Sequence, residues 1–371
     1  MKILIDLTAL ADNYSGMEHY AESIVKELLK NEKGSDVFYE LVFKNEVFKS
    51  FLIYEAYENV SFTVLEGKDK LYFNQVVLLK YLNKTKADRY VFIAFPAPLL
   101  FRKKNSTSVI FDMVCWDCPE TMTTKAKYYF RAGITHAAKI SDQIITISEF
   151  SKKRIVQRFP KVSDKIHIVY CGVDEQYIEE TEKNVTEESL EAVRGKYNLP
   201  ENYILCLSTV EPRKNMRLLI EAYDELIQEG KITEKLVIVG RKGWKVEKLL
   251  EGVSKACTSN IVFTGFVDGE DLPIIYRAAK CFVFPSLYEG FGMPPLEAMA
   301  CGTKVLASDI EVAKEVLGNY VFYFESGDKQ SLCDKLVEIG EVQAISDAKD
   351  CVLKYSWRKE AEKMRKLLQA D

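Results

Sequence analysis

The chain has 371 residues, which is long for one typical domain and suits two α/β domains, each large enough to bury a core. Hydrophobic residues make up 47% and charged residues 29%, a balance typical of an ordered globular protein. The formal net charge of -4 disfavours a general nucleic-acid binder, because such proteins need a basic field to neutralise phosphates. No nucleic-acid partner is therefore expected.

The start of the chain and its cysteine content favour a cytoplasmic location. The opening apolar run meets Asp6 too early to form a signal peptide, and no stretch has the length of a membrane-spanning helix. The nine cysteines are scattered, several within apolar runs, as expected of reduced and buried thiols. Cys115 and Cys118 form a lone C-x-x-C, and with only three histidines in the chain no metal site is expected there.

Positive charge is concentrated in the first half of the chain. Residues 102–104 read Arg-Lys-Lys, and a second group of cations lies on or beside a probable helix, at Lys152, Lys153, Arg154, Arg158, Lys161 and Lys165. Two interpretations remain open: a solvated helix face, which is the commoner case, or a peripheral contact with the anionic inner face of the plasma membrane.

Short apolar runs alternate with amphipathic stretches, the pattern of βα units that build parallel sheets. The first half predicts strands at residues 2–8, 37–43, 90–95, 108–112, 143–147 and 165–170, with a helix between the first two. Residues 173–200 are polar and rich in Glu, which indicates an interdomain connection followed by an exposed helix.

The second half repeats the pattern and ends in a charged amphipathic helix at residues 357–369. Its predicted strands are residues 203–207, 235–239, 260–264, 281–285, 304–308 and 320–324. The expected fold class is α/β, with two facing Rossmann-like domains of parallel sheets. The N-terminal domain would span residues 1–174, with residues 355–371 crossing back to it, and the C-terminal domain would span 175–354. Ligands of such sheets bind beyond the carboxyl ends of the strands, so an interdomain cleft is the expected site.

The strongest local signal lies at residues 284–298, which read FPSLYEGFGMPPLEA. A buried strand ends there, a turn with Gly290 and Gly292 follows, and a Pro-Pro pair predicts a helix start with Glu297 in its first turn. Glycines let the backbone approach a ligand, and the N–H groups of a helix start favour an anion. Glu289 and Glu297 flank this site, and acidic groups suit a phosphate site only if they bind hydroxyls. The alternative is a capping loop whose Glu297 complements the helix dipole, but it leaves Glu289 unexplained.

A second signal follows the predicted strand at 203–207, where residues 208–215 read STVEPRKN. Arg213 and Lys214 stand at the carboxyl end of a strand, where Arg can fork onto two phosphate oxygens while Lys supplies a point charge. Such a pair alone is more often solvated, but beside the glycine turn it indicates a diphosphate site. These cations could stabilise a departing nucleoside diphosphate, so the site is predicted to need no metal ion.

These motifs resemble those of the retaining glycosyltransferases of family 4, which have the GT-B fold of two facing Rossmann-like domains. The likeness covers nearly the whole chain. The family's E-x7-E pattern falls on Glu289 and Glu297, and its E-P-R-K-N string falls on residues 211–215. The resemblance implies that Glu297 binds the ribose, that Glu289 lies by the transferred sugar, and that Arg213 and Lys214 bind the diphosphate.

The same resemblance implies that residues 264–267 line the base pocket and that further residues bind the donor. These donor-binding residues are Gly290, Phe291, Gly292, Met293, Pro294, Leu296, Ser208, Gly240, Gly265, Phe266 and Val267.

In the first half, residues 15–20 look like the family's glycine-containing loop after the first strand, although an ordinary strand-to-helix turn fits equally well. On this resemblance the acceptor or phosphate side is expected at Gly16, Tyr20, Asp112 and Ser148. Phe111 stands where relatives often carry His, and a phenyl ring cannot hydrogen-bond a sugar hydroxyl.

The resemblance implies transfer of mannose, rhamnose or a similar hexose from a nucleotide diphosphate to a glycan or lipid-linked acceptor. It implies retention of anomeric configuration, no cofactor, and a place in bacterial O-antigen or capsule synthesis. Two alternatives stay open. A dinucleotide oxidoreductase would need G-x-G-x-x-G after the first strand, where residues 8–16 hold one glycine. The second alternative is a relative that binds nucleotide sugars but has weakened catalysis. The presence of Phe111 in place of the usual His is the only observation that favours it.

Overall fold

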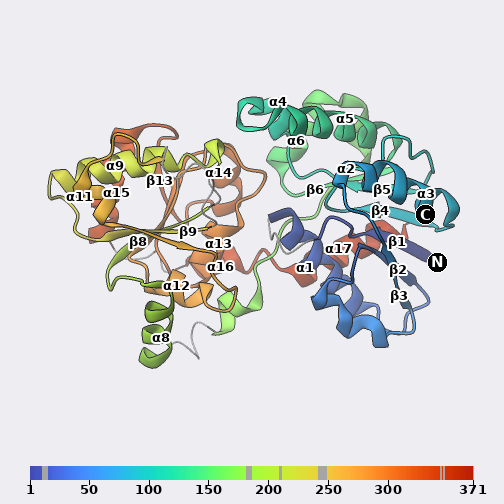
Figure 1. Cartoon of the computed structure of the whole chain (residues 1–371), viewed down its shortest axis with the longest axis horizontal. Coiled ribbons are helices and arrows are strands. Elements are labelled where there is room, and N and C mark those ends of the chain that lie inside the picture. Colours follow the sequence, from blue (N-terminus) through green and yellow to red (C-terminus); the bar gives the residue numbers. More distant parts are fainter. Residues whose placement is uncertain are drawn as a thin grey trace. The chain divides into compact units, whose positions relative to one another are not determined.

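The computed structural model describes residues 1–10, 16–180, 186–208, 211–240, 249–342, 345 and 347–370. They form two compact units: unit 1 holds Met1–Gly172 and Trp357–Asp371, and unit 2 holds Val173–Ser356 (Figure 1). The boundary falls two residues before the one expected at 174/175. Parts of three predicted segments lie outside the described residues: Ser15 of the first glycine loop, residues 181–185 of the polar connection, and Thr209 and Val210.

Unit 1 is built on a parallel sheet, whose strands in the described residues pair in the order β3-β2-β1-β4-β5-β6-β7. Every strand predicted for this half overlaps an observed one, but β3 was missed. β3 is an edge strand in which Ser and Thr alternate with apolar residues that are partly buried or exposed, so it lacks the continuous apolar run of a buried parallel strand. The strands are β1 (Lys2–Asp6), β2 (Phe38–Lys44), β3 (Val60–Leu65), β4 (Arg89–Phe92), β5 (Ser106–Val109), β6 (Gln143–Thr146) and β7 (Ile166–Ile168).

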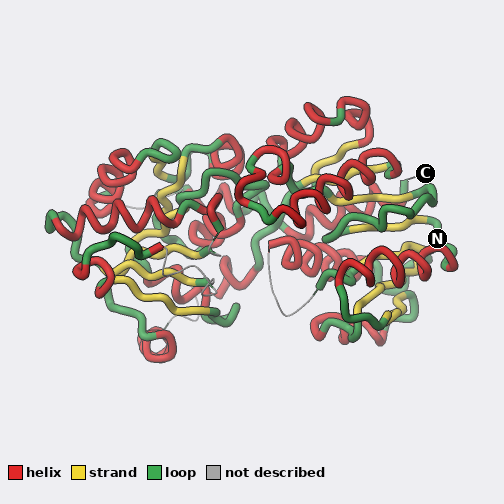
Figure 2. The backbone as a smooth tube through the Cα atoms, turned by 45° about the horizontal axis from the view of Figure 1, so that its top comes forward, coloured by secondary structure: helices red, strands yellow, loops and turns green. Residues whose placement is uncertain are grey.

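Helices lie on both faces of this sheet (Figure 2). Apolar side chains of residues 73–82 pack on β1, β2 and β4, and those of α5 and α6 pack on β6 and β7. The helical segments are α1 (Gly16–Asn31), η1 (Lys49–Ala56), α2 (Lys70–Tyr72), η2 (Phe73–Leu78), α3 (Leu79–Lys84), α4 (Val114–Asp117), η3 (Pro119–Thr121), α5 (Thr124–Ile140), α6 (Glu149–Arg158), η4 (Pro160–Lys165) and α17 (Trp357–Gln369).

The C-terminal helix α17 packs against α1 and is anchored in unit 1 by buried polar contacts. Glu360, only 2% exposed, accepts the backbone N–H of Tyr170 at 2.9 Å. At the other end of the helix, the Arg89 guanidinium donates to the carbonyls of Leu368 at 3.2 Å and Ala370 at 2.6 Å. A cation at a helix C-terminus satisfies its free carbonyls and complements the helix dipole. Helix α17 is therefore an integral part of unit 1, although it is far in sequence from the rest of that unit.

Gly172 leaves no room for a side chain where α17 begins. A Cβ at this position would lie 2.3 Å from the backbone N of Trp357 and 2.5 Å from its ring. We therefore expect Gly172→Ala to lower the free energy of unfolding by about 1–3 kcal/mol through overpacking. Urea unfolding would measure this change.

Gly195→Ala is the matched control, because Gly195 lies in a helix of unit 2 with nothing within 4 Å of its added Cβ. That change should be neutral or stabilising by about 0.5–1 kcal/mol. Equal effects of the two substitutions would contradict the proposed close contact.

Unit 2 contains a second parallel sheet, and its described strands follow the order β10-β9-β8-β11-β12-β13. Each strand predicted for this half overlaps an observed one, and for β8 and β9 the predicted bounds match. The strands are β8 (Tyr203–Leu207), β9 (Lys235–Val239), β10 (Ile261–Gly265), β11 (Cys281–Phe284), β12 (Val305–Ser308) and β13 (Phe322–Phe324).

The main core of unit 2 lies between this sheet and two amphipathic helices, α9 and α15. The helical segments are η5 (Gln176–Glu180), α8 (Glu187–Tyr197), η6 (Pro212–Lys214), α9 (Met216–Gln228), α11 (Lys255–Ser259), α12 (Leu272–Ala278), α13 (Met293–Ala300), α14 (Glu311–Leu317), α15 (Lys329–Glu341) and α16 (Ala348–Val352). Within the described ranges of both units, no helix combines the length and apolar character needed to cross a bilayer.

Candidate functional site

Three predicted donor residues lie side by side at the carboxyl edge of the sheet of unit 2. Gly240, which follows β9, donates its N–H to the carbonyl of Gly265 at the end of β10, at 3.0 Å. Ser208, which follows β8, donates its N–H to the carbonyl of Val239 at 2.9 Å. Gly240 has φ 144°, and a Cβ there would lie 2.2 Å from the Ser208 carbonyl oxygen. Only glycine therefore fits at this point of the edge.

A buried ion cluster lies at the same edge, where β8 and β11 end. Glu289 is 6% exposed, and its two carboxylate oxygens bind different cations. Arg213 Nη1 lies 2.8 Å from Oε2, and Lys214 Nζ lies 2.5 Å from Oε1. The Ser286 hydroxyl also donates to Oε1, at 2.8 Å. The structure thus brings together the three residues predicted to be catalytic.

The cluster keeps Glu289 ionised. Burial alone would raise the pKa of this carboxyl, but the attraction of Lys214 and Arg213 and the bonds from Lys214 and Ser286 outweigh it. The pKa of Glu289 therefore lies below its ordinary value. An ionised carboxylate can only accept hydrogen bonds, so Glu289 is suited to bind donors such as hydroxyl groups.

The backbone fixes the cluster before any ligand is present. The loops after β8 and β11 are joined because Leu287 donates its N–H to the carbonyl of Arg213 at 2.8 Å. The buried hydroxyl of Ser308, at the end of β12, donates to the carbonyl of Ser286. Asn215 ends the short helix η6 in the left-handed conformation, with φ 51°, and so turns the chain into α9.

The prediction that Glu297 lies in the first turn of its helix is wrong. Gly292 has φ 103° and caps α13, which begins at Met293, so Glu297 falls in the second turn. The Pro-Pro pair lies within the first turn that follows this start, where proline is tolerated. These prolines have no N–H, so the helix start offers an anion fewer donors than the sequence suggested.

Glu297 lies in a different environment from Glu289. Its side chain is partly buried and accepts a hydrogen bond from the Tyr276 hydroxyl at 2.9 Å. Burial raises the pKa of Glu297 to about 7; the Tyr276 bond opposes this shift and the charge of Asp174 adds to it. Near neutral pH this carboxyl can therefore both accept and donate hydrogen bonds.

The side chains of several predicted donor residues point into the core. Phe291 is 4% exposed and makes an edge contact with Tyr355, and Leu296 and Val267 are also buried. A ligand could therefore meet these three residues through backbone atoms. Phe266 is 60% exposed, in contrast. The remaining residues of the loop are Gly290, which is buried, and Met293 and Pro294, which are partly buried.

Tyr20 of unit 1 is buried in the core and not on an acceptor surface. Its side chain is fully buried, and its hydroxyl donates to the carbonyl of Val169 at 3.2 Å. Its ring makes edge contacts with Phe111 and Trp357, with centroids 5.3 and 5.7 Å apart. Apolar packing is thus a sufficient reason for an aromatic residue at position 111.

The other residues predicted for the acceptor side also have local structural roles. Ser148 is buried and caps α6 by accepting the N–H of Ser151 at 3.0 Å. Asp112 accepts the N–H of Val114 at 3.0 Å. Gly16 is the first residue of α1. Their part in acceptor binding stays a prediction.

Sequence reasoning missed Ser286, Tyr276 and Asp174. Ser286 lies within the recognised motif, and its position three residues before Glu289 could have suggested the contact. Tyr276 and Asp174 lie far from Glu297 in the sequence, so no local pattern relates them to it.

The C-x-x-C pair consists of free thiols, as do the other cysteines, all of which are described. Burial raises the pKa of Cys115 to about 12. In the described part of the chain, no group of three or more His, Cys, Asp and Glu side chains is arranged to hold a metal ion.

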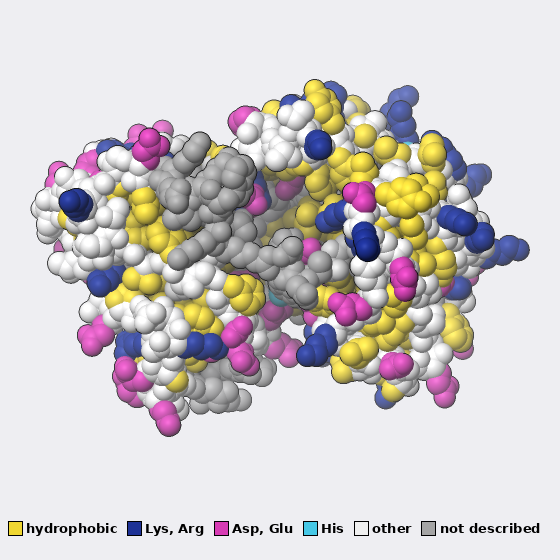
Figure 3. Space-filling model, viewed as in Figure 1, with side chains coloured by type: hydrophobic (Ala, Val, Ile, Leu, Met, Phe, Trp, Pro, Cys, Tyr) yellow, Lys and Arg dark blue, Asp and Glu magenta, His cyan; other side chains and the backbone are white. Residues whose placement is uncertain are grey.

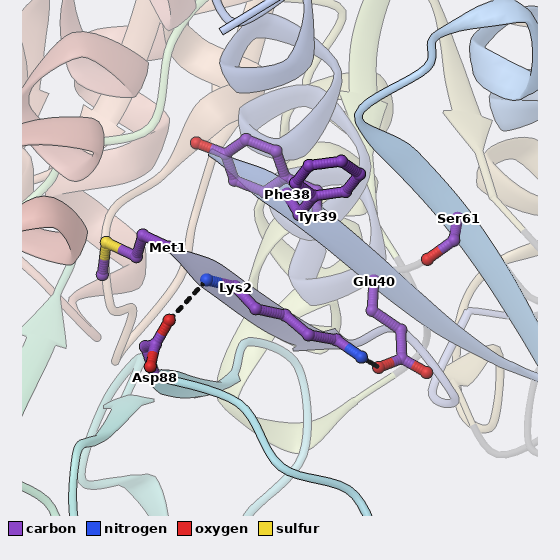
Figure 4. A pocket seen from close by; sticks show the side chains of 7 residues that line it. All are labelled: Met1, Lys2, Phe38, Tyr39, Glu40, Ser61 and Asp88. Carbon is purple, nitrogen blue, oxygen red and sulfur yellow. Dashed lines mark hydrogen bonds and ion pairs between the residues drawn. The ribbon is translucent and has the colours of Figure 1, made fainter. Parts of the chain in front are cut away.

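A pocket of about 380 Å³ lies in unit 1, at the edge of the sheet that is opposite to the carboxyl ends of its strands (Figure 4). It surrounds Lys2, whose N–H donates to Asp88 at 2.7 Å and whose ammonium group lies 2.8 Å from Glu40. This is the amino end of β1 and β2, whereas parallel sheets bind ligands at the carboxyl ends. Its lining residues, none of them a predicted site residue, are Met1, Lys2, Phe38, Tyr39, Glu40, Ser61 and Asp88.

Comparison with known proteins establishes the family. Residues 187–352 match the family described as "Glycosyl transferases group 1". The O-antigen chain mannosyltransferase B of Escherichia coli is 30% identical over 267 residues, which cover 69% of this chain and 68% of that protein. The serotype-specific mannosyltransferase WbdA of Escherichia coli is 34% identical over 198 residues, which cover 52% of this chain but only 24% of that protein. The chain belongs to the group 1 glycosyl transferases and is a glycosyltransferase, as the resemblance implied.

Solved structures confirm the fold class. WaaG, a glycosyltransferase involved in lipopolysaccharide biosynthesis, has a TM-score of 0.73 at 15% identity, with 100% of both chains covered. HepE of Anabaena, in complex with UDP and glucose, has a TM-score of 0.72 at 17% identity, with 99% of both chains covered. The expected GT-B fold of two Rossmann-like domains is therefore confirmed.

The raised pKa of Glu297 predicts a pH-dependent cost to folding. Between its ordinary pKa of 4.5 and about 7, the folded state holds the proton more tightly than the unfolded state, so this contribution to stability falls as pH rises. Glu297→Gln removes that cost, and we expect the variant to gain up to about 3 kcal/mol over the unsubstituted protein at pH 8 and much less at pH 5.

Urea unfolding at both pH values would measure the gain, with the exposed Glu270→Gln in unit 2 as control. A gain that does not depend on pH would show that the Glu297 carboxyl titrates normally.

Proposed function

We propose that the chain is a retaining mannosyltransferase that uses a nucleotide-diphosphate sugar and extends a glycan or lipid-linked acceptor in O-antigen synthesis. The observation that carries this proposal is the binding of Arg213 and Lys214 to one buried carboxylate beside the glycine turn of residues 290–292. Mannose is favoured because both relatives from E. coli are named mannosyltransferases, and O-antigen because one of them is named an O-antigen chain mannosyltransferase.

In this proposal the donor lies across the carboxyl edge of the sheet of unit 2. The diphosphate would meet Arg213 and Lys214, and the glycine turn would let backbone N–H groups approach it. Glu297, with a carboxyl that both accepts and donates, would bind the ribose hydroxyls. The backbone at Gly240 and Gly265 and the exposed ring of Phe266 would border the base.

The reaction breaks the bond between the anomeric carbon and the diphosphate oxygen, and negative charge builds on the leaving phosphate. Arg213 and Lys214 are already in place to stabilise that charge, so the proposed mechanism needs no metal ion. The acceptor hydroxyl attacks from the face on which the phosphate leaves, and its proton passes to the leaving phosphate. Glu289 positions the sugar; its oxygens already bind Arg213, Lys214 and Ser286, which makes it a weak nucleophile.

A nucleotide should raise the melting temperature of the protein by mass action, and the diphosphate should account for much of the effect. We expect one of GDP, UDP, dTDP and ADP to give the largest shift, and the matching monophosphate a smaller one. Lys214→Ala should weaken diphosphate binding by about tenfold or more while leaving monophosphate binding nearly unchanged.

Lys231→Ala is the matched control, because Lys231 is an exposed lysine of unit 2 that pairs with Glu229. A failure of all four diphosphates to shift the melting temperature would argue against the donor class.

Glu289→Gln tests the role of the buried carboxylate in turnover. The amide keeps the shape of the side chain but removes the charge that orients both cations, so we expect kcat to fall about 10²-fold or more. Transfer from radiolabelled donor to acceptor would measure this, and product anomer analysis by NMR would test retention.

Glu211→Gln is the control, since Glu211 also pairs with Arg213, at 2.9 Å, but is exposed. Near-normal turnover of Glu289→Gln would remove Glu289 from the mechanism.

A further inference from the structure

One region of unit 1 carries a charge pattern that the donor site proposed in unit 2 does not explain. Residues 70–87, 89–111 and 121–141 contain four Lys or Arg each and no Asp or Glu, although the whole chain has a net charge of -4. Acids elsewhere in the chain therefore outnumber bases, and the positive charge is concentrated here. Of these cations Arg89 is buried and bonded to α17, and the exposed ones are Lys70, Lys80, Lys84, Lys86, Arg102, Lys104, Lys125 and Lys139.

The fold joins these stretches into one surface. The backbone N–H of Leu99 donates to the side-chain oxygen of Gln75 at 2.9 Å. The hydroxyl of Tyr129 donates to the side-chain oxygen of Asn74 at 3.4 Å. Segment α2–η2, the loop of residues 94–104 and helix α5 are thus in contact. We call the surface that they form the docking face.

The docking face exposes large apolar side chains among its cations. Monomeric proteins expose single apolar residues at random, but an apolar group with a basic rim is typical of an interaction site. Figure 3 shows hydrophobic side chains gathered over this part of unit 1, with Lys and Arg around them. The exposed fractions are 56% for Leu71, 59% for Tyr72, 43% for Val76, 67% for Leu100 and 61% for Tyr128.

The more C-terminal group of cations, at residues 152–165, is partly used inside the protein. Arg154 forms an ion pair with Asp117 at 2.5 Å, and Lys165 donates to the carbonyls of Ala138 and Ser141. Arg158 lies over the ring of Trp116. Some docking-face cations are also used inside the protein, since Lys103 donates to the carbonyl of Thr85 and Arg131 to that of Cys115. The exposed cations of the docking face are Lys70, Arg102, Lys104, Lys125 and Lys139.

We propose that the docking face binds the anionic surface of a lipid bilayer. Basic side chains without acids in the same stretches match a continuous layer of phosphate headgroups, and the exposed leucines and tyrosines match the boundary between headgroups and acyl chains. Tyrosine is suited to this boundary because its ring is apolar and its hydroxyl is polar. This inference is independent of the sugar that is transferred.

Co-sedimentation of the full chain with vesicles tests the proposal. We expect binding to phosphatidylcholine vesicles that contain phosphatidylglycerol, little binding to phosphatidylcholine alone, and weaker binding as salt is added. Two double variants should each lower the partition coefficient about tenfold or more: Leu71→Ser with Leu100→Ser, and Lys104→Glu with Lys125→Glu.

Two double variants away from the docking face serve as controls. Leu52→Ser with Ile53→Ser changes exposed apolar residues of η1 in the same unit, and Lys235→Glu with Lys255→Glu changes exposed lysines of unit 2. Both should bind like the unsubstituted chain, and all variants should keep its melting temperature and nucleotide response. Absent binding, equal binding to both kinds of vesicle, or equal losses in test and control variants would overturn the proposal while leaving the donor site untouched.

Discussion

The binding of Arg213 and Lys214 to the buried carboxylate of Glu289 is the interaction on which the site of unit 2 depends. A charge taken out of water is costly, and it is stable only when cations and hydrogen bonds compensate it fully. Here the two cations that compensate the charge of Glu289 lie on the loop after β8. Glu289 itself follows β11, the strand next to β8 in the sheet. The cost of burial therefore forces the two loops together and holds two cations at one point of the sheet edge.

The two glutamates of the E-x7-E motif have opposite electrostatic environments. Cations lower the pKa of Glu289, whereas burial beside Asp174 raises that of Glu297 to about 7. Carboxyl groups whose pKa values are driven apart can perform different tasks at one pH. In this site the ionised group orients cations and accepts hydrogen bonds, and the group near neutrality can also donate them. The two glutamates of the motif are chemically identical, so their different functions come from their different surroundings.

Sequence patterns predicted most of the central strands, since buried parallel strands are continuous apolar runs. They also placed Arg213, Lys214 and Glu289 together, because neighbouring parallel strands end at one edge of the sheet. Three features escaped. Edge strand β3 has too many polar residues for that pattern, and the start of α13 depends on the left-handed Gly292. The contact of Tyr276 with Glu297 is set by tertiary packing, which has no local signal.

Positive charge serves two physically different purposes in this chain. In unit 2, the buried carboxylate of Glu289 holds Arg213 and Lys214 at fixed points, and Arg213 also pairs with the exposed Glu211. Cations held in this way suit a diphosphate of defined geometry. On the docking face the exposed cations are spread over α2, the loop of residues 94–104 and α5, on long side chains. Such a diffuse field suits a headgroup layer whose phosphates have no fixed positions. In unit 2, pairing with an acid fixes the cations and so favours one ligand geometry. On the docking face, cations that are not fixed in this way can bind phosphates in many arrangements.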